Sequence, residues 1–207
     1  MNVNVTRVVN NISITADVSE RAVVPASTKI WHLAQVRQGA VLGENVVVGR
    51  GAYIGRGVHV GDNCKIQNYA LVYEPAELAP GVFIGPAAVL TNDHNPRAVN
   101  PDGTQKAASD WDLVGVKVGE GASIGARAVC VAPVEIGSWA MVAAGAVVTK
   151  NVPAHALVVG VPARQVGWVG LTGVKLIKND NDPSLFHCPA TGKNYREVED
   201  SLQEVTS

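Results

Sequence analysis

The 207-residue sequence lacks a strong excess of charge of either sign. Its formal net charge is −1 at pH 7, from 17 Lys and Arg residues and 18 Asp and Glu residues, and it contains no long basic run. Proteins that bind nucleic acid or an acidic membrane surface usually carry such a basic patch. We therefore expect no nucleic acid and no membrane as partners.

Long apolar segments are absent as well. No stretch approaches the roughly 18 consecutive apolar residues of a membrane-spanning helix. Residues 1–17 are polar and rich in asparagine, unlike the core of a signal peptide. We therefore expect a cytoplasmic protein. The apolar content of 47% argues against disorder and, with the chain length, fits one substantial domain.

Cysteine is scarce. The three cysteines, Cys64, Cys130 and Cys188, lie far apart in the sequence. This spacing fits neither a disulfide framework nor a Cys-x-x-Cys metal clip. We expect all three to be small buried hydrophobic residues.

The sequence does contain a six-residue repeat. An aliphatic residue occupies every sixth place over fourteen successive positions. These positions are Ile12, Val18, Val24, Ile30, Val36, Leu42, Val48, Ile54, Val60, Ile66, Val72, Leu78, Ile84 and Leu90. Glycine often follows the aliphatic residue, as at Gly43, Gly49 and Gly55. This period belongs neither to a helix nor to a β-hairpin.

The repeat predicts a solenoid of short strands. Each hexad supplies one strand and a turn that glycine eases, and three hexads close one triangular coil. The aliphatic side chains point inward, so stacked coils bury a column that no single coil could bury alone. Burial of each of these side chains stabilises the fold by about 1.5–3 kcal/mol. Because three hexads complete one coil, residues three hexads apart should stack at about the 4.8 Å spacing of neighbouring strands.

The repeat is interrupted once. It resumes at Val118, and the separation between Leu90 and Val118 is not a multiple of six. The segment of roughly 91–114 must therefore leave the coil as an extruded loop, and loops of this length are usually functional. The resumed positions are Val118, Ile124, Cys130, Ile136, Val142 and Val148.

The pattern breaks again after Val148, where Pro153 and Pro162 follow. We expect the solenoid to end there beneath a cap. The sequence thus predicts a β-helix domain over residues 1–170. Residues 171–207 are predicted to form a linker and a small appended hairpin, without an assigned role.

The stacking of successive coils brings polar side chains together at the start of the loop. One outward column reads Gln38, Arg56, Glu74 and Asn92, so Asn92 opens the loop directly above Glu74. A second column contains His32, Arg50 and Asn68, where Arg50, like Arg56, can simply be solvated. The loop start, residues 91–97, adds a carboxylate, an imidazole and a guanidinium. Such an inventory favours a binding or catalytic site.

These features resemble the hexapeptide-repeat acyltransferases over about residues 12–167. The more specific stretches are Ile30-Trp31-His32, Lys65-Ile66-Gln67-Asn68, Val72-Tyr73-Glu74, Gly85-Pro86, Thr91-Asn92 with Asn95-Pro96-Arg97, and Val159-Gly160-Val161-Pro162-Ala163-Arg164. Together they are most similar to enzymes that acetylate the 3-amino group of UDP-2-acetamido-3-amino-2,3-dideoxy-glucuronate. Acetyltransferases of dTDP-3-amino-3,6-dideoxyhexoses are a step further away.

The resemblance implies a fold and an activity. The fold is an all-β, left-handed parallel β-helix that forms a homotrimer with its active sites between subunits. The activity is an N-acetyltransferase that uses acetyl-coenzyme A (acetyl-CoA) as co-substrate and a nucleotide sugar as acceptor, without a metal ion.

The chemistry of amide formation and, for Asn92, the resemblance suggest catalytic residues. The attacking amine must be unprotonated, although aliphatic amines are largely protonated near neutral pH. His94 is a candidate base, because imidazole titrates in the useful range, although the family does not require histidine there. Asn92 matches the family pattern and would orient the amine. In that case Glu74 or the departing coenzyme thiolate could receive the proton.

Two sets of binding residues complete the expected site. The nucleotide-sugar set is His32, Gln67, Asn68, Tyr73 and Arg97. The coenzyme set is Ala144, Gly145, Gly160, Pro162 and Arg164. Arg97 suits bidentate pairing with a phosphate or carboxylate, and Arg164 would reach a phosphate of the coenzyme. For Trp31 and Tyr73, stacking on a base and burial in the core are both open.

Three alternatives stay open. A serine or other small-acceptor acetyltransferase should carry a catalytic histidine with an acidic partner. A non-catalytic nucleotide-binding or scaffolding solenoid should have a chemically plain loop. A γ-type carbonic anhydrase needs three histidines that converge on zinc. The histidines of this sequence are scattered, and His59 falls out of phase between His32 and His94.

Overall fold

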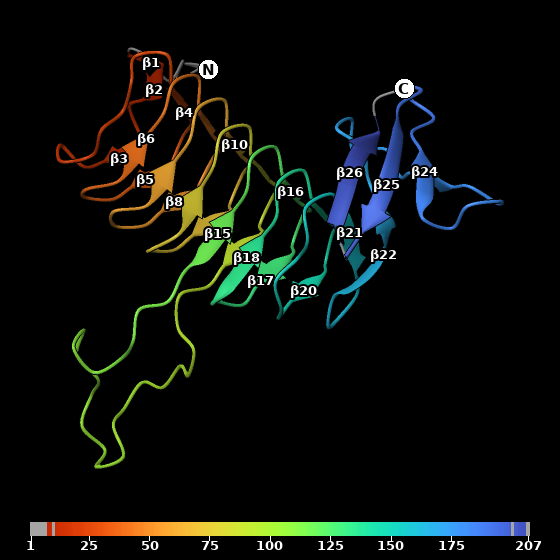
Figure 1. Ribbon diagram of the computed structural model, residues 1–207. Helices are drawn as coiled ribbons and strands as arrows, with labels where there is room; N and C mark the ends of the chain where they lie inside the picture. Colours follow the sequence, from red (N-terminus) through yellow and green to blue (C-terminus); the bar gives the residue numbers. More distant parts are fainter. Residues whose placement is uncertain (1–7, 10, 200, 206–207) are drawn as a thin grey trace, which may run out of the picture.

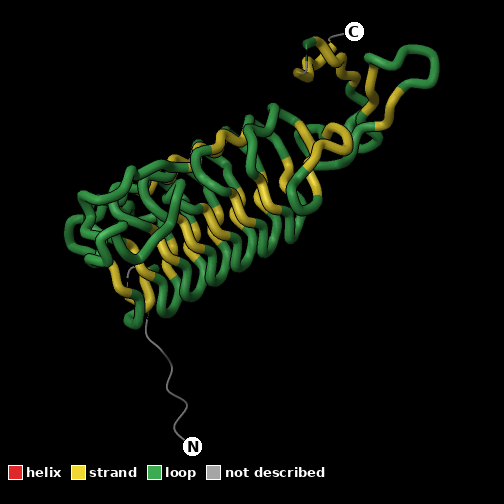
Figure 2. Tube along the Cα trace, turned by 90° about the horizontal axis from the view of Figure 1, so that it is seen from below, coloured by secondary structure: helices red, strands yellow, loops and turns green. Residues whose placement is uncertain are grey.

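The computed structural model describes residues 8–9, 11–199 and 201–205. Within these ranges the chain forms strands, turns and loops but no α-helix. Accordingly, no described helix is long and apolar enough to cross a membrane. Most strands are very short, because each hexad provides only a brief strand before the chain turns a corner. The coils lie side by side along one axis (Figure 2).

The strands form three faces around the axis, which we call faces A, B and C. Face A contains, in spatial order, β1 (Val8–Val9), β2 (Ile12–Ser13), β4 (Lys29–Ile30), β7 (Val47–Val48), β10 (Lys65–Ile66), β13 (Phe83–Ile84), β16 (Ser123–Ile124), β19 (Met141–Val142), β21 (Ala156–Val159) and β22 (Arg164–Trp168). Face B contains β20 (Val147–Val148), β17 (Val129–Cys130), β14 (Val89–Leu90), β11 (Leu71–Val72), β8 (Tyr53–Ile54), β5 (Gln35–Val36) and β3 (Asp17–Val18). Face C contains β18 (Val134–Ile136), β15 (Val116–Val118), β12 (Glu77–Leu78), β9 (His59–Val60) and β6 (Val41–Leu42).

The pairing register confirms the predicted coil. Within face A, Ile66 pairs in parallel with Ile84, which lies three hexads further along the chain. The predicted column positions from Ile30 to Leu90 and from Val118 to Val148 are at most 3% exposed. The coils therefore form a left-handed parallel β-helix (Figure 1).

All three cysteines are free and buried, as predicted. Cys64 and Cys130 lie within the column, where the repeat usually places alanine or an aliphatic residue. Burial raises the pKa of the Cys130 thiol to about 12. These two thiols therefore act as small core side chains.

The extruded loop lies where the sequence predicts it. Ile84 pairs with Ile124 rather than with a residue three hexads further on, so the coil between these two residues contains the insertion. The loop leaves after β14, returns at β15 and projects away from the coils (Figure 1). Isolated antiparallel bridges, Asp93 with Leu113 and Val99 with Gln105, hold its two legs together.

The solenoid continues further than the sequence predicts. Strand β21 still pairs in parallel with β19, and Val152, Ala156 and Val158 are buried. Leu157 lies opposite Met141, where a full coil of three hexads would bring Val159, so this last coil is shortened. Pro153 is tolerated because it lies at a corner, where it needs no ladder hydrogen bond. The antiparallel strand β22 then caps face A.

The C-terminal segment is larger than the predicted hairpin. It is a four-stranded antiparallel sheet of β23 (Ile177–Lys178), β24 (Leu185–His187), β25 (Asn194–Val198) and β26 (Ser201–Val205). Phe186 and Tyr195 are buried and belong to the same apolar cluster as Trp168 at the end of the coil. The sheet therefore packs on the solenoid through aromatic side chains.

Candidate active site

The predicted site residues occupy two different corners of the triangular coil. We call the turns from face A to face B corner AB, and the turns from face B to face C corner BC. Corner AB carries His32, Gln67 and Asn68, directly after strands of face A. Corner BC carries Glu74 and the start of the loop, directly after strands of face B. Within a single chain, the nucleotide-sugar residues at corner AB are thus separated from Glu74 and the loop at corner BC.

A hollow at corner AB collects three of the predicted nucleotide-sugar residues. Its volume is about 350 Å³. It is lined by Trp31, His32, Val47, Gly49, Arg50, Gln67 and Asn68. The sequence prediction included His32, Gln67 and Asn68, and the structure adds Trp31 and Arg50 to the same wall.

The amide of Asn68 has a fixed orientation in this hollow. Its Oδ1 accepts the backbone N–H of Arg50 at 2.8 Å. Because a backbone N–H can only donate, the oxygen must face Arg50, which leaves the amide NH₂ free to donate elsewhere. A Cβ atom on Gly49 would lie 2.7 Å from that oxygen, so only glycine leaves room for Asn68 to fold back.

Glu74 occupies at corner BC the position that Asn68 occupies at corner AB, but its side chain forms no such hydrogen bond. Its Oε2 is buried and has no hydrogen-bond partner among the described atoms. The oxygen lies against Gly55, where an added Cβ atom would collide with it. By contrast, Asp62, placed the same way at the third corner, accepts the backbone N–H of Glu44 at 2.8 Å. Glu74 therefore keeps an unused acceptor beside the loop.

Two tyrosines border Glu74. The rings of Tyr53 and Tyr73 lie 5.1 Å apart and are both half-buried. Burial and, secondly, the charge of Glu74 raise the pKa of the Tyr53 phenol. Tyr73 thus belongs to corner BC rather than to the predicted nucleotide-sugar hollow.

The base of the loop fixes the backbone of Asn92. Val72 pairs with Leu90, and Glu74 and Asn92 each follow their member of this pair by two residues, so they lie at equivalent positions on neighbouring coils. The carbonyl of Asn92 accepts the N–H of Val114 from the other leg, at 3.3 Å. The Asn92 side chain makes no hydrogen bond within the described part of the chain, so its amide is free for a ligand.

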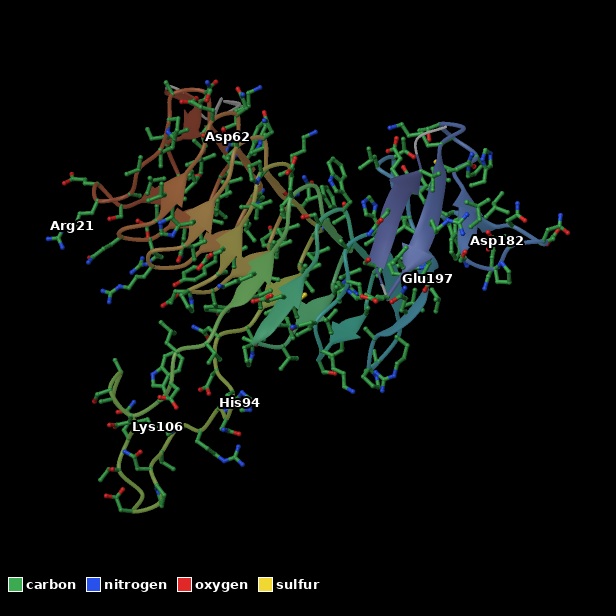
Figure 3. The ribbon with its side chains drawn as sticks, viewed as in Figure 1. Arg21, Asp62, His94, Lys106, Asp182 and Glu197 are labelled. Atoms are coloured by element: carbon green, nitrogen blue, oxygen red, sulfur yellow. The ribbon has the colours of Figure 1, made fainter. Side chains whose placement is uncertain are left out.

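Beyond Asn92, His94 and Arg97 are exposed, whereas Asp93 is half-buried. Asp93 accepts the backbone N–H of Asn95 at 2.8 Å, so its carboxylate is engaged in a local turn instead of pairing with His94. His94 projects from the loop near the coil (Figure 3). Arg97 donates only to the carbonyl of Pro96 at 2.9 Å and lies outside the hollow of Asn68.

The predicted coenzyme residues cluster at the C-terminal end of the solenoid. The carbonyl of Gly160 accepts the N–H of Val147 at 3.0 Å, and Ala163 donates to the carbonyl of Val147 at 2.7 Å. Segment 160–163 thereby covers β20, close to the exposed turn of Ala144 and Gly145. Arg164 and Lys150 line a nearby cavity of about 240 Å³. The exposed Pro162 lies in the same turn.

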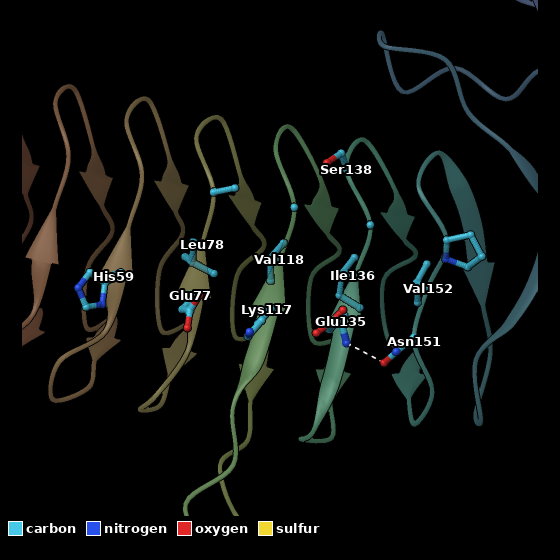
Figure 4. A pocket seen from close by; sticks show the side chains of 14 residues that line it. His59, Glu77, Leu78, Lys117, Val118, Glu135, Ile136, Ser138, Asn151 and Val152 are labelled. Carbon is cyan, nitrogen blue, oxygen red and sulfur yellow. Dashed lines mark hydrogen bonds between the residues drawn. The ribbon is translucent and has the colours of Figure 1, made fainter. Parts of the chain in front are cut away.

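Face C carries a groove of about 610 Å³ that the sequence pattern does not predict (Figure 4). Successive strands place His59, Glu77, Lys117 and Glu135 along it. The repeat does show that these four residues point outward, because each directly precedes an inward aliphatic residue. The described residues contain no group of three or more potential metal ligands, here or elsewhere.

Comparisons with known proteins agree with this fold. Residues 39–69 and 115–150 match the family described as the hexapeptide repeat of succinyl-transferase. The chain is 36% identical over 129 residues to serine acetyltransferase 2 of Arabidopsis thaliana, which covers 61% of this chain and 36% of that protein.

A second relative is the dTDP-3-amino-3,6-dideoxy-alpha-D-galactopyranose 3-N-acetyltransferase of Aneurinibacillus thermoaerophilus. It is 42% identical over 88 residues, which are 42% of this chain and 44% of that protein. The chain thus spans less than half of the length of either relative.

A solved structure with a similar coil is a hexapeptide-repeat acetyltransferase from Vibrio cholerae in complex with acetyl-coenzyme A. Its TM-score is 0.51 at 24% identity, over 63% of this chain and 70% of that chain, and this likeness shows the fold. The repeat, the coil and these matches identify the chain as a hexapeptide-repeat protein that is similar to acetyltransferases over the matched segments.

Proposed function

We propose that the protein is an acetyl-coenzyme A-dependent N-acetyltransferase that acts on the 3-amino group of a nucleotide-linked amino sugar. The proposed acceptor resembles UDP-2-acetamido-3-amino-2,3-dideoxy-glucuronate. The observation that carries the proposal is the loop base, where the unengaged amide of Asn92 follows the unpartnered carboxylate oxygen of Glu74. The names of the relatives, an amino-sugar and a serine acetyltransferase, support acetyl transfer to a small acceptor.

The division of the site between two corners supports a homotrimer. Corners AB and BC of one chain lie at opposite edges of face B, whereas corner AB of one copy can meet corner BC of its neighbour. Face B carries a column of outward apolar side chains, which are Tyr53, Leu71, Val89, Val129 and Val147. The outward residues of face C are instead mostly charged. Association through face B would bury apolar surface and complete the site.

The order of the coils supports opposite approaches for the two substrates. His32, Arg50 and Asn68 lie on three successive coils, about 4.8 Å apart along the axis. The loop of Asn92 follows on the next coil, and Ala144 and Gly145 lie on the far side of it. The nucleotide sugar would therefore approach from the N-terminal coils and the coenzyme from the C-terminal coils. Their reactive ends would meet at the loop.

This arrangement suits direct attack of the amine on the thioester. The Asn92 amide oxygen accepts one amine hydrogen and directs the nitrogen lone pair at the acetyl carbonyl carbon. The new C–N bond forms, the C–S bond breaks, and the coenzyme leaves as a thiolate. The nitrogen loses one proton, which passes to Glu74, to His94 or to the thiolate itself. Arg164 holds the coenzyme by a phosphate.

A second function is favoured by the 36% identity to a serine acetyltransferase. In that alternative the acceptor is the hydroxyl of serine, and His94 acts as the base. The engagement of Asp93 with Asn95 works against it, because no described acidic side chain hydrogen-bonds His94. The two functions differ in the acceptor that becomes acetylated, which is an amino group of a nucleotide sugar in the first and the hydroxyl of serine in the second.

The test is a thiol-release assay with acetyl-coenzyme A against UDP- and dTDP-linked 3-amino sugars, with serine as a competing acceptor. We expect release only with a free 3-amino group, and none with the 3-hydroxyl sugar. Release with serine and not with any amino sugar would establish the second function. Comparing Glu74→Gln with His94→Ala tests the proton acceptor, since a variant that removes the acceptor should lose turnover at neutral pH. Full turnover in both variants would assign the proton to the coenzyme thiolate.

A further inference from the structure

The loop that bears Asn92 is anchored to the following coil by the residue before it. The N–H of Thr91 donates to the carbonyl of Cys130 at 3.0 Å, as in other stacked coils. In addition, the hydroxyl oxygen of Thr91 accepts the backbone N–H of Ala132 at 2.9 Å. The whole extruded loop lies between Thr91 and Ala132 in the sequence. This side-chain hydrogen bond therefore ties the start of the loop to the next coil.

The N–H of Ala132 depends on that hydroxyl. At corner AB, the N–H of Arg50 is instead accepted by Asn68, at the equivalent position one coil further on. The residue equivalent to Ala132 on its next coil is Lys150, whose side chain accepts no hydrogen bond. Ala132 is buried, so loss of the Thr91 hydroxyl would leave a buried donor without a partner. The coil would have to open locally to satisfy it.

The returning leg of the loop holds Asn92 from the other side. The carbonyl of Asn92 accepts the N–H of Val114 at 3.3 Å. Gly115 lies tightly against the preceding coil, because a Cβ atom added to it would lie 2.9 Å from the carbonyl oxygen of Pro75. The backbone of Asn92 is thus fixed between two coils. Its side-chain amide makes no hydrogen bond within the described residues and stays available.

We infer, as a step that rests on the proposed function, that Thr91 is a positioning residue for acetyl transfer. Its hydroxyl fixes the backbone of Asn92 relative to the coils that bind the two substrates, and the Asn92 amide then directs the amine at the thioester. Thr91 acts through Asn92 rather than on a reacting atom. Because a displacement of about 1 Å can lower a rate about 100-fold, this anchor controls turnover more than affinity.

Two substitutions of Thr91 test the role. Thr91→Val keeps the shape of the side chain but removes the acceptor, whereas Thr91→Ser keeps the hydroxyl. We expect Thr91→Val to lower kcat about 10- to 100-fold. The KM for each substrate should stay within about threefold, as for an interaction that acts in the transition state. Thr91→Ser should retain nearly all of the turnover. An unchanged kcat in Thr91→Val would overturn the inference.

Ser27 offers a matched control. Its hydroxyl also accepts a backbone N–H from the next coil, that of Asn45, at 2.9 Å, but this bond joins coils at the N-terminal end of the solenoid. Ser27→Ala should therefore leave kcat unchanged. If Ser27→Ala lowered kcat as much as Thr91→Val, turnover would follow the general integrity of the coils, and Thr91 would have no specific role.

A double variant shows whether Thr91 acts through Asn92. The kcat of Thr91→Val combined with Asn92→Ala should equal that of Asn92→Ala alone within about twofold, because residues that act as a unit are not additive. Losses that multiply in the double variant would mean that Thr91 acts independently of Asn92, contrary to the inference.

Amide hydrogen exchange separates the anchor from the proposed function, because it requires no substrate. Thr91→Val should speed exchange of the Val114 N–H, which donates to the carbonyl of Asn92, and Thr91→Ser should not. Faster exchange at Val114 in a protein that acetylates no amino sugar would support the anchor and contradict the proposed function. Unchanged exchange at Val114 in Thr91→Val would refute the anchor even if an amino sugar is acetylated.

Discussion

The side-chain oxygen of Asn68 accepts the backbone N–H of Arg50 at 2.8 Å, from one coil to the next. This bond uses the acceptor of the amide and leaves both N–H donors free. Gly49 makes the approach feasible, because any side chain there would collide with Asn68. The repeat that builds the coil thus also orients a binding residue.

Replacing Asn68 by aspartate separates the two roles of its amide. Asn68→Asp keeps an acceptor for Arg50 but loses the donors and adds a negative charge near the proposed diphosphate. We expect the KM for the nucleotide sugar to rise about tenfold or more, since a hydrogen bond to a charged group contributes about 1.5–3 kcal/mol. The melting temperature should change little. An equal KM in both proteins would exclude Asn68 from binding.

Removal of the Asn92 side chain should affect chemistry more than binding. We expect Asn92→Ala to lower kcat about 100-fold, because orientation of the attacking group can contribute several kcal/mol. The affinity for the sugar should change only modestly. Asn181→Ala, in the C-terminal segment, controls for a general effect of removing an amide. Unchanged turnover would remove Asn92 from the mechanism.

Two impaired variants, assayed at a nucleotide-sugar concentration well below the KM, should complement each other if the site lies between copies. One variant carries Asn92→Ala and the other carries Asn68→Ala. Random co-assembly into trimers gives intact residues on both sides of about one quarter of the sites. We therefore expect mixed refolding of equal amounts to restore about a quarter of the unchanged activity. Activity that stays at the level of the separate variants would place both residues in one chain's site.

Arg164 should act on the coenzyme alone. The guanidinium is exposed at the C-terminal end of the solenoid and donates to the carbonyl of Ala163 at 2.9 Å. We expect Arg164→Ala to raise the KM for acetyl-coenzyme A several-fold, because a phosphate contact is lost. The KM for the sugar should stay nearly constant, and a rise in that constant as well would contradict the assignment.

His155 should make the stability of the protein depend on pH. Burial lowers the pKa of its imidazole below the usual 6.5, although the carbonyl of Val169 holds the Nδ1 at 3.0 Å and opposes the shift. The unfolded chain therefore takes up a proton more readily than the folded chain. The stability that His155 contributes is complete above pH 6.5 and is lost as the pH falls through the folded pKa.

The measurement is a series of thermal melts from roughly pH 7.5 to roughly pH 5, which spans the range in which imidazole titrates. We expect the melting temperature to fall toward acid pH, and to fall less in His155→Asn, which carries no titrating ring. Asparagine is the suitable replacement because His155 has a φ of 63°, a conformation that asparagine tolerates. Parallel curves for the two proteins would show that another group controls acid stability.

Parts of the candidate site could be read from the sequence and parts could not. The period of three hexads correctly placed Asn92 one coil after Glu74, because strand pairing repeats with that period. The exposure of Trp31 and the engagement of Asp93 depend on side-chain conformations, which the period does not specify. The face C groove escaped prediction because the period shows which residues point outward but not where the surface is hollowed.

The sequence by itself determined the coil. An aliphatic residue at every sixth place can be buried only if the chain turns after each short strand, so the period fixes the faces, the register and the break at the loop. Only the tertiary structure decided how the solenoid ends. Strand β21 joins face A after a shortened coil, and Phe186 and Tyr195 pack near Trp168 in the C-terminal sheet. Those contacts join segments without a common period, so no local pattern announces them.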